Sequence, residues 1–549
     1  MTPDRTAGAD FTPWPEALAR TYRAAGYWRG ETFSVWLRRL SERYGDRPAL
    51  HGAERGAART VTYRDLHDRT SGYAAAFAAR GLRRGDRVVM QLPNTPAFYE
   101  VLMGLLRLGV QPVLALAAHR EQELRSFVAQ TAARALITAD THAGFDHRTL
   151  ARAVQAAYPA LQVLVLGDAQ DFTPLAPLDP AAWPDQPEPA GAAGTVALFQ
   201  LSGGSTGTPK LIPRTHDDYL YSIRASAELC RLDPGTVFLA ALPAAHNFTL
   251  TSPGALGTLH AGGQVVLAAS PAPDEAFALM NARGVTHVAL VPSALLVWLR
   301  AAPGWTFPAL QVVQVGGAPL SESAARQVPQ VFGAALQQVF GMAEGLVNYV
   351  RAGSPDDVTF RTQGRPISPH DEVLVVDDED RPVPDGRPGH LLTRGPYTIR
   401  GYFRAPDHNA RAFTPDGYYR TGDIVTRRPD GHLTVTGRHK DQINRGGEKI
   451  AAEEIEHALQ GHPLVFQAAL VGVPDPWLGE RSCAFVQLRE PTGPELPLEL
   501  RRFLRAQGLA DYKLPDRVEA LPELPRTPFG KIDKPALRAR LNARERSLP

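Results

Sequence analysis

Short apolar runs alternate with longer segments of helical spacing through most of this chain. The runs 88–92, 112–116 and 135–138 fit buried strands, and the Ala/Leu/Arg-rich segment 66–80 fits a helix. Strands that alternate with helices predict parallel sheets with helices on their faces. A second series of apolar runs continues the pattern at 237–242, 265–268, 288–291 and 312–315.

Three changes in this pattern indicate where the chain divides. A proline-rich stretch within 172–194 interrupts the alternation and predicts a connection between two lobes. From about Glu372 the runs become strand-rich and are separated by Gly, Pro and Asp turns, which predicts a small β-barrel-like unit. A charged turn after Gly437 then leads into an α+β tail. We therefore predict an N-terminal α/β domain over 1–437, with two parallel-type lobes and the β unit, and a small mobile α+β domain over 438–549.

The composition excludes several classes of protein. With 549 residues, 44% of them hydrophobic and 21% charged, the chain can bury a large core. A net charge of +2 argues against nucleic acid as the main partner. The N-terminus has no apolar signal core, and no apolar stretch reaches the ~20 residues of a membrane helix. Cys230 and Cys483 lie far apart in apolar segments, so we expect a cytoplasmic protein without disulfides or membrane contact.

The segment 201–210 follows the apolar run 196–201 and is the strongest functional signal. It holds three glycines, four hydroxyl side chains and one lysine. Glycines let backbone N–H groups close around a polyphosphate, hydroxyls donate further bonds, and a lysine adds a point charge. The segment does not fit the Walker A pattern. A flexible connection is the alternative explanation of such a loop.

Two strand ends are candidates for a nucleotide site. In 337–344 a purine could stack on Phe340, and Glu344 could hold Mg²⁺. In 314–318 paired glycines would let a flat ring lie against the backbone. In isolation, a core aromatic beside a helix N-terminal glutamate is the commoner explanation of the first segment, and a tight strand-to-helix turn explains the second equally well.

Three later segments carry charged residues in glycine-rich surroundings. Asp423 fits either a turn residue or a carboxylate that accepts both hydroxyls of a ribose. The charged stretch 437–450 fits either a solvated linker or a hinge between two folded units. Lys531, on the loop 525–531, is either an ordinary solvated lysine or a cation that swings over an active site to neutralise a transferring phosphoryl group.

Taken together, these segments occur in the order found in the acyl- and aryl-adenylating superfamily, which includes acyl-CoA synthetases, nonribosomal adenylation domains and luciferases. The chain resembles that superfamily from about Phe11 to its last helix, and within it is most similar to the stand-alone 2,3-dihydroxybenzoate–AMP ligases. Phe340 and Ala343 replace the usual tyrosine and threonine of one motif, a replacement that the aryl-acid subgroup shares. The longest matching strings are 201–219, 337–349, 393–397 and 440–454.

The resemblance implies ATP-dependent activation of an aryl acid to an acyl-adenylate, with release of pyrophosphate. Lys531 would bridge the carboxylate and the α-phosphate, Thr206 and Glu344 would lie near Mg²⁺, and His246 would complete the catalytic set. Asp423 would bind the ribose. The implied ATP- and AMP-binding residues are Ser202, Gly203, Gly204, Ser205, Thr206, Gly207, Lys210, Gly316, Gly317, Ala318, Val339, Phe340, Gly341, Asp423 and Arg438.

The acid pocket is implied by the segment 243–252. In the family, the asparagine at the position of Asn247 binds the ortho-hydroxyl of the acid, and the serine at the position of Ser252 faces the meta position. This pair favours 2,3-dihydroxybenzoate over salicylate. Thr249 and Thr251, like Phe248, differ from the commonest siderophore version, so salicylate or a related hydroxyaryl acid stays an alternative. The implied substrate-binding residues are Asn247, Phe248, Ser252, Gly317 and Val339.

A second half-reaction is implied, in which the phosphopantetheine thiol of a separate aryl carrier protein takes the acyl group in siderophore-type nonribosomal peptide biosynthesis. Lys440 falls at the family's hinge position. Coenzyme A as acceptor is an alternative, and so is a nucleotide-binding regulatory protein without turnover. We expect a monomer or a homodimer. The implied pantetheine path is Arg445, Gly446, Gly447, Glu448 and Lys449.

Overall fold

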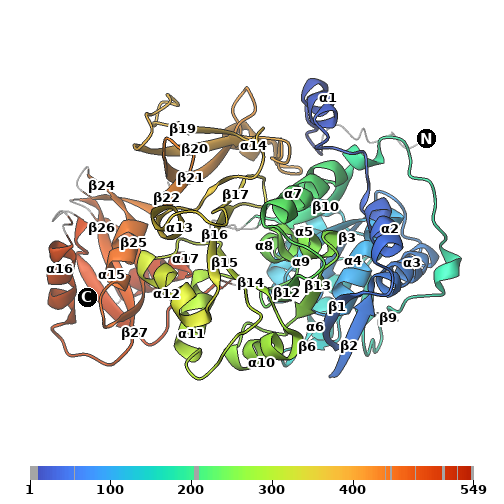
Figure 1. Ribbon diagram of the computed structural model, residues 1–549, viewed down its shortest axis with the longest axis horizontal. Helices are drawn as coiled ribbons and strands as arrows, with labels where there is room; N and C mark the ends of the chain where they lie inside the picture. Colours follow the sequence, from blue (N-terminus) through green and yellow to red (C-terminus); the bar gives the residue numbers. More distant parts are fainter. Residues whose placement is uncertain are drawn as a thin grey trace.

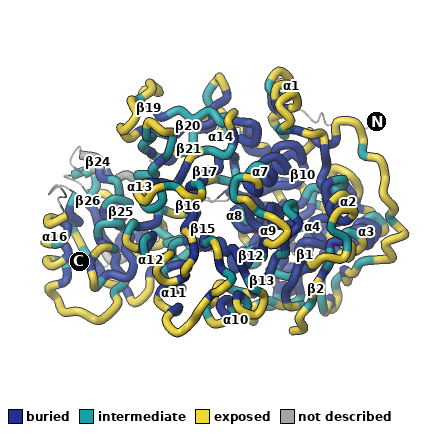
Figure 2. The backbone as a smooth tube through the Cα atoms, viewed as in Figure 1, coloured by how far each residue is buried: buried dark blue, intermediate teal, exposed yellow. Residues whose placement is uncertain are grey.

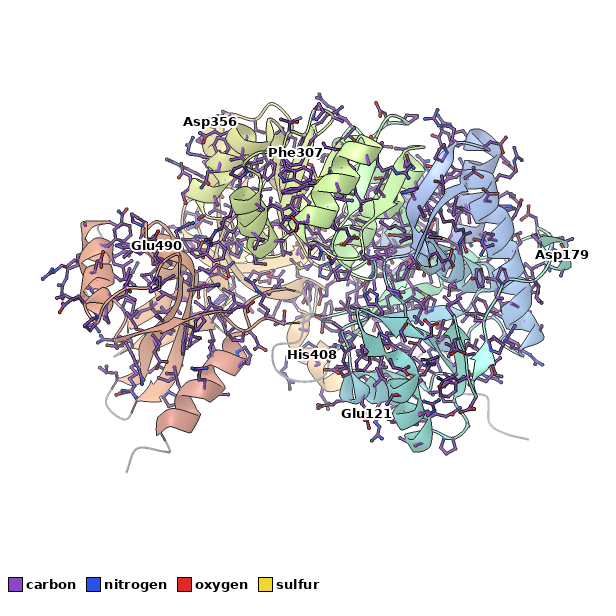
Figure 3. All side chains as sticks on the ribbon, turned by 90° about the horizontal axis from the view of Figure 1, so that it is seen from below. Glu121, Asp179, Phe307, Asp356, His408 and Glu490 are labelled. Carbon is purple, nitrogen blue, oxygen red and sulfur yellow. The ribbon has the colours of Figure 1, made fainter. Side chains whose placement is uncertain are left out.

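The computed structural model shows a mixed α/β protein, as the sequence predicts (Figure 1). A large body, coloured blue to yellow in Figure 1, lies beside a C-terminal unit coloured orange to red. Figure 3 shows the same unit, marked by Glu490, as a separate body next to the rest. The structure describes residues 10–54, 56–202, 209–438, 441–445, 448–475, 478–507, 509, 513–527 and 530–545.

Seven strands form the first sheet: β3 (Arg87–Gln91), β4 (Gln111–Ala115), β5 (Ala135–Ala139), β8 (Gln162–Leu166), β9 (Thr173–Pro174), β10 (Val196–Leu201) and β11 (Leu211–Thr215). Their order is β11-β10-β4-β3-β5-β8-β9. The central strands are parallel, as predicted, and β11 returns antiparallel to β10 at one edge. A small hairpin of β6 (Thr141–His142) and β7 (Phe145–Asp146) lies outside this sheet.

Nine strands form the second sheet: β1 (Pro48–Glu54), β2 (Ala57–Thr62), β12 (Val237–Ala240), β13 (Gln264–Leu267), β14 (His287–Leu290), β15 (Val312–Gly316), β16 (Ala335–Gly341), β17 (Val347–Tyr349) and β18 (Arg365–Pro366). Their order is β18-β17-β16-β15-β14-β12-β13-β1-β2. The four apolar runs of the second series are the parallel strands β12, β13, β14 and β15.

Helices cover the outer faces of both sheets and fill the space between them. Side chains of β3 point alternately to its two faces: Val88 and Met90 belong to the core between the sheets, and Val89 belongs to the outer core. The inner helices are α3 (Tyr63–Ala79), α4 (Pro96–Leu108), α7 (His216–Leu229) and α9 (Gly254–His260). The outer helices are α5 (Glu121–Thr131) and α6 (His147–Ala157) on the first sheet, and α10 (Pro273–Arg283), α11 (Pro292–Ala301) and α12 (Glu322–Phe332) on the second. Figure 2 shows the central strands of these sheets buried and much of the covering helices α10, α11 and α12 exposed.

The proline-rich stretch does not connect two lobes, contrary to the prediction for 172–194. It leads from β9 to β10 through two short 3-10 turns, η1 (Pro180–Ala182) and η2 (Ala192–Gly194), and both strands belong to the first sheet. The chain passes to the main series of the second sheet after α7. Prolines mark an irregular surface connection, but they carry no information about which strands pair on either side of it.

The strand-rich region is a four-stranded antiparallel sheet with β19 and β22 as its edges: β19 (Glu372–Val376), β20 (Pro388–Arg394), β21 (Tyr419–Arg427) and β22 (Leu433–Arg438). The C-terminal unit has a five-stranded sheet of β23 (Gln442–Arg445), β24 (Glu448–Ala451), β25 (Val465–Asp475), β26 (Gly479–Leu488) and β27 (Arg517–Leu521). Its helices are α15 (Ala452–Gln460), α16 (Leu496–Ala506) and α17 (Lys534–Glu545). The remaining helices are α1 (Glu16–Ala24), α2 (Phe33–Tyr44), α8 (Asn247–Thr251), α13 (Asp356–Arg361) and α14 (Pro406–Ala412). Among the described residues, no helix has the length and apolar character needed to cross a membrane.

Candidate active site

The glycine-rich loop connects the antiparallel strands β10 and β11. At its base the Ser202 N–H donates to the carbonyl of Lys210 at 3.0 Å, and the Lys210 N–H donates to Ser202 Oγ at 2.9 Å. These reciprocal bonds fix both ends of the loop at the edge of the first sheet. The other loop residues predicted to bind phosphate lie outside the described residues: Gly203, Gly204, Ser205, Thr206 and Gly207.

Glu344 is held by a buried tyrosine pair beside the base of this loop. The Tyr402 hydroxyl donates to Glu344 Oε1 at 2.8 Å and lies 2.8 Å from the Tyr419 hydroxyl oxygen. Burial, and then the charge of Glu344, raise the pKa of Tyr402, so its phenol keeps the proton that it donates. Lys210 Nζ lies 6.0 Å from the centre of the Tyr402 ring. The carboxylate therefore has a fixed orientation close to the loop.

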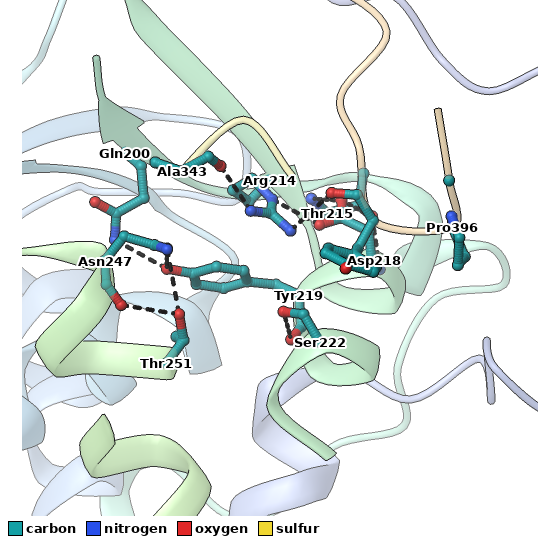
Figure 4. Close-up of polar contacts among 12 residues, drawn as sticks. Gln200, Arg214, Thr215, Asp218, Tyr219, Ser222, Asn247, Thr251, Ala343 and Pro396 are labelled. Atoms are coloured by element: carbon teal, nitrogen blue, oxygen red, sulfur yellow. Dashed lines mark hydrogen bonds and ion pairs between the residues drawn. The ribbon is translucent and has the colours of Figure 1, made fainter. Parts of the chain in front are cut away.

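Arg214 on β11 ties the loop hairpin to the segment that carries Glu344. Its guanidinium forms an ion pair with Asp218, with Nε 2.7 Å from Oδ1. The same group donates to the carbonyl of Ala343 at 2.7 Å (Figure 4). It also donates to the carbonyl of Tyr397 at 3.1 Å. Because both charges are buried, losing either one would leave the other uncompensated. The pair thus fixes the backbone immediately before Glu344.

Gly316 and Gly317 form a flat turn at the end of β15. A Cβ on Gly316 would lie 2.7 Å from the carbonyl oxygen of Val339 and 3.2 Å from Phe248 Cζ. Gly317 has a φ of +85°, which disfavours any other residue. Gly316 is therefore packed against the parallel strand β16, and the half-buried Gly317 leaves bare backbone next to it. Ala318 follows this turn, and Phe340 and Gly341 end the neighbouring strand.

Asn247 begins α8, and one end of its side-chain amide is held in place. Its Oδ1 accepts from the Tyr219 hydroxyl at 2.7 Å and from Thr251 Oγ1 at 3.2 Å. The Tyr219 oxygen accepts in turn from Gln200 Nε2 at 2.9 Å (Figure 4). With Oδ1 occupied, the Nδ2 amino group is the end of the amide left to donate to a ligand.

Ser252 directly follows α8 and is 5% exposed. It lies beside the buried Tyr349: burial raises the pKa of that phenol, and the hydroxyls of Ser226 and Ser252 act in the opposite direction. Phe248, from the same helix, packs against Gly316. One short helix and the residue after it therefore carry the three side chains predicted to contact the acid.

Lys531 reaches this site from the C-terminal unit. Its Cε is 3.8 Å from the position that a Cβ on Gly317 would take. The carbonyl of Gly530 accepts from Ser293 Oγ at 3.0 Å, at the start of α11. Two predicted site residues from separate units of the fold, Lys531 and Gly317, are thus brought together.

His246 lies in the same place and is held in its neutral form. Burial lowers its pKa to about 4, and the Lys531 ammonium acts in the same direction. Nδ1 accepts from the Phe248 N–H at 3.3 Å, which leaves the proton of the neutral ring on Nε2. A neutral imidazole can donate to an anionic ligand without adding a second positive charge.

The profile of the family described as AMP-binding enzyme matches residues 37–403, and that of the AMP-binding enzyme C-terminal domain matches 454–531. The chain belongs to the AMP-binding enzyme family. It is 53% identical over 535 residues to a 2,3-dihydroxybenzoate-AMP ligase of Bacillus subtilis, covering 96% of this chain and 97% of the relative.

Two further relatives span almost the whole chain. A vibriobactin-specific 2,3-dihydroxybenzoate-AMP ligase of Vibrio cholerae is 49% identical, covering 97% of this chain and 98% of the relative. The apo structure of Mycobacterium smegmatis MbtA is 46% identical, with a TM-score of 0.75, and covers 97% of this chain and 99% of that one. The fold of this chain therefore matches that of a solved structure over almost the full length of both chains.

In this AMP-binding enzyme the predicted ribose residues come from neighbouring strands. Asp423 of β21 pairs in register with Arg438 of β22. Asp423 is 3% exposed, and its N–H donates to Thr421 Oγ1 at 3.0 Å. For Arg438 the structure describes only the main chain. The strand register thus brings these two positions side by side, and their ribose-binding role stays a prediction.

The predicted hinge and pantetheine path are described only in part. Arg445 forms an ion pair with Asp516, with Nη2 2.7 Å from Oδ1. Its guanidinium is therefore engaged within the C-terminal unit. Lys440, Gly446 and Gly447 lie outside the described residues, and for Glu448 and Lys449 only the main chain in β24 is described.

Sequence reasoning missed the residues that support the site from behind. Tyr402, Arg214 and Tyr219 appeared only within matching strings or not at all, and Ser293 gave no signal. One local signal was available: Thr215 and Asp218 form a capping box, which places Tyr219 on the first turn of α7 beside the strand end. The other three residues each contact a segment far along the chain, since 58 positions separate Tyr402 from Glu344, 129 separate Arg214 from Ala343 and 237 separate Ser293 from Gly530, so local pattern cannot reveal these contacts.

Proposed function

We propose that this protein is an aryl-acid–AMP ligase that activates 2,3-dihydroxybenzoate with ATP and loads it onto a separate aryl carrier protein in siderophore biosynthesis. One juxtaposition carries the proposal: Lys531 lies against Gly317 and acts on His246, directly before Asn247 on α8. A cation, a bare backbone surface and a polarised amide thus converge on one place. The two relatives named as 2,3-dihydroxybenzoate-AMP ligases support the choice of acid.

The first half-reaction joins two anions. A carboxylate oxygen of the acid attacks the α-phosphorus of ATP, the bond to the bridging pyrophosphate oxygen breaks, and an acyl-adenylate and pyrophosphate result. The main work of the protein is alignment and neutralisation of charge. Lys531 would bridge the acid carboxylate and the α-phosphate, and Lys210 with its loop would hold the departing phosphates. Asp423 and Arg438 would keep the ribose in place.

Mg²⁺ is part of the proposal because the donor set suits it. Within the described part of the chain, no group of three His, Cys, Asp or Glu side chains could hold a metal. A single carboxylate completed by substrate phosphates and water is a common arrangement for Mg²⁺. Glu344, oriented by Tyr402, would supply that carboxylate, with Thr206 beside it. Bound Mg²⁺ would neutralise phosphate charge.

The acid would lie between α8 and the Gly316–Gly317 turn. Asn247 Nδ2 would donate to the ortho-hydroxyl oxygen, because the Tyr219 bond directs Oδ1 away. Ser252 would pair with the meta-hydroxyl. An acid without that hydroxyl loses this hydrogen bond, a difference of about 0.5–1.5 kcal/mol. Salicylate is therefore a weaker substrate than 2,3-dihydroxybenzoate.

The second half-reaction needs a different arrangement. A pantetheine thiolate attacks the carbonyl carbon of the acyl-adenylate, a thioester forms, and AMP leaves with the electron pair of the broken bond. Lys531 is no longer needed once pyrophosphate has left, and in this arrangement it lies against the Gly316–Gly317 turn. We therefore propose that the C-terminal unit rotates at Lys440 and that the segment 445–449 then lines the path of the arm.

Pyrophosphate exchange into ATP tests this function. We expect exchange that depends on an aryl acid, with kcat/KM highest for 2,3-dihydroxybenzoate, lower for salicylate and lowest for benzoate and picolinate. Absence of exchange with every aromatic acid would refute the proposal and favour a regulatory nucleotide-binding protein. Comparing AMP release driven by coenzyme A and by a phosphopantetheinylated aryl carrier protein identifies the acceptor, and we expect the carrier protein to be the faster.

A further inference from the structure

The loop that carries Lys531 is held by two different parts of the molecule. Within the C-terminal unit, the Thr527 N–H donates to the carbonyl of Lys531 at 2.7 Å, and the Gly530 N–H donates to that of Thr527 at 2.8 Å. Arg526 donates to the Gly530 carbonyl at 3.0 Å and to Gln467 Oε1 of β25 at 2.7 Å. These contacts shape the loop on its own unit and would move with it.

The second attachment comes from the large body and reaches the same carbonyl. Ser293, near the start of α11, donates its hydroxyl proton to the Gly530 oxygen at 3.0 Å across 237 residues of sequence. Val291, before the same helix, lies between the two glycines: its methyl carbons are 3.4 Å from a Cβ position on Gly317 and 3.9 Å from one on Gly530. The Lys531 loop therefore contacts the body at the β14–α11 connection, next to the Gly316–Gly317 turn where Lys531 would act.

We propose that Ser293 is a positioning residue for the first half-reaction, because its hydroxyl latches the Lys531 loop onto the body in the adenylating arrangement. This inference rests on the proposed function. Arg526 moves with the loop, whereas the Ser293 bond exists only while the loop is docked. Removing it therefore weakens the docked arrangement relative to the rotated one, and the two half-reactions respond in different directions.

Three variants test the latch. Ser293→Ala removes the hydroxyl, and Ser293→Thr keeps it. Val297→Ala is the matched control, because it trims a side chain that is 40% exposed one turn further along the same helix. The two measurements are pyrophosphate exchange with 2,3-dihydroxybenzoate, and transfer of the acyl group from synthetic 2,3-dihydroxybenzoyl-AMP to phosphopantetheine.

We expect Ser293→Ala to lower kcat of exchange about 2- to 10-fold, the range for one neutral hydrogen bond, with the KM values for acid and ATP nearly unchanged. Transfer from the synthetic adenylate is expected to be unchanged or faster, and Ser293→Thr and Val297→Ala to behave as wild type in both assays. Equal losses in the two half-reactions, or exchange equal to wild type in Ser293→Ala, would overturn the proposal.

Amide hydrogen exchange tests the Ser293 latch by a measurement that does not depend on enzyme turnover. Peptides that contain Gly530 and Lys531 are expected to exchange faster in Ser293→Ala than in wild type or Val297→Ala. Equal protection in all three proteins would overturn the latch even in a protein that turns over no acid. A wild-type enzyme without acid-dependent pyrophosphate exchange would defeat the proposed function alone, so the two failures are distinguishable.

Discussion

The hydroxyl of Tyr219 donates to Asn247 Oδ1 at 2.7 Å, and this bond decides which end of the amide faces the proposed acid pocket. The Tyr219 ring is buried, and the guanidinium carbon of Arg214 lies 4.5 Å from its centre. Arg214 in turn holds the carbonyl of Ala343, next to Glu344. Tyr219 therefore joins the acid pocket to the segment proposed to bind metal and phosphate.

Tyr219→Phe is expected to weaken recognition of the ortho-hydroxyl. Without the phenol proton, the Asn247 amide loses a donor to Oδ1 and can turn. We expect the KM for 2,3-dihydroxybenzoate to rise about 2- to 10-fold, with the KM for ATP unchanged. The control is Tyr221→Phe on the same helix, which removes a 2.7 Å bond to Ser368 Oγ. An equal fall of kcat/KM for 2,3-dihydroxybenzoate and benzoate would contradict the specific role.

Lys531→Ala is expected to separate the two half-reactions. Loss of a charged stabiliser of this kind costs about 10²–10³ in rate, so pyrophosphate exchange should fall by that factor. Transfer from synthetic aryl-adenylate to phosphopantetheine should stay close to wild type. Lys513→Ala is the control, because that lysine pairs with Glu454 at 2.7 Å within the same unit. Loss of both half-reactions in Lys531→Ala would show that the lysine serves the fold.

Glu344 and Tyr402 are expected to control the Mg²⁺ requirement. Glu344→Gln removes the charge, so exchange should need several-fold more Mg²⁺ for half-maximal rate and reach a lower maximum. Tyr402→Phe removes only the hydrogen bond that orients Glu344. The Mg²⁺ concentration for half-maximal rate should therefore rise less than in Glu344→Gln. Tyr418→Phe is the control, because its phenol donates to a different carboxylate, Glu372, at 2.8 Å. A Mg²⁺ titration that is unchanged in Glu344→Gln would contradict the assignment.

Asp371 is expected to make stability depend on pH. Burial raises its pKa to about 7, although Tyr397 and Ser368 donate hydrogen bonds to it. Between pH 4 and 7 the unfolded carboxyl is ionised while the folded one keeps its proton, so this group's contribution to stability falls as pH rises through that window. The free energy of unfolding of Asp371→Asn, relative to that of wild type, should therefore increase by on the order of 2–4 kcal/mol between pH 5 and pH 8.

Urea unfolding at the two pH values measures this gain. Asp274→Asn, at an exposed position on α10, is the control and should track wild type at both. A constant difference between Asp371→Asn and wild type would mean that the folded carboxyl does not titrate in this range.

The strands were predictable because each is a short apolar run that carries its own signal. The runs 88–92 and 135–138 are β3 and β5, and 312–315 is β15. Which elements the proline-rich stretch connects was not predictable, because β9 and β10 join one sheet through pairings with strands elsewhere in the chain. The glycine pair at 316 and 317 is visible in the sequence as a motif, but only the packed structure shows why Gly316 is required, because the carbonyl oxygen of Val339 lies 2.7 Å from its Cβ position.

Local pattern determined the mixed α/β class, and motif order singled out the candidate nucleotide residues and Lys531, because those signals lie within short stretches of sequence. Tertiary packing decided that Tyr219 orients Asn247, that Tyr402 orients Glu344, and that Ser293 meets the carbonyl of Gly530. Each of these contacts joins separate elements of the fold. A hydrogen bond reaches only about 3 Å, so such partners are identified only once the whole chain has packed.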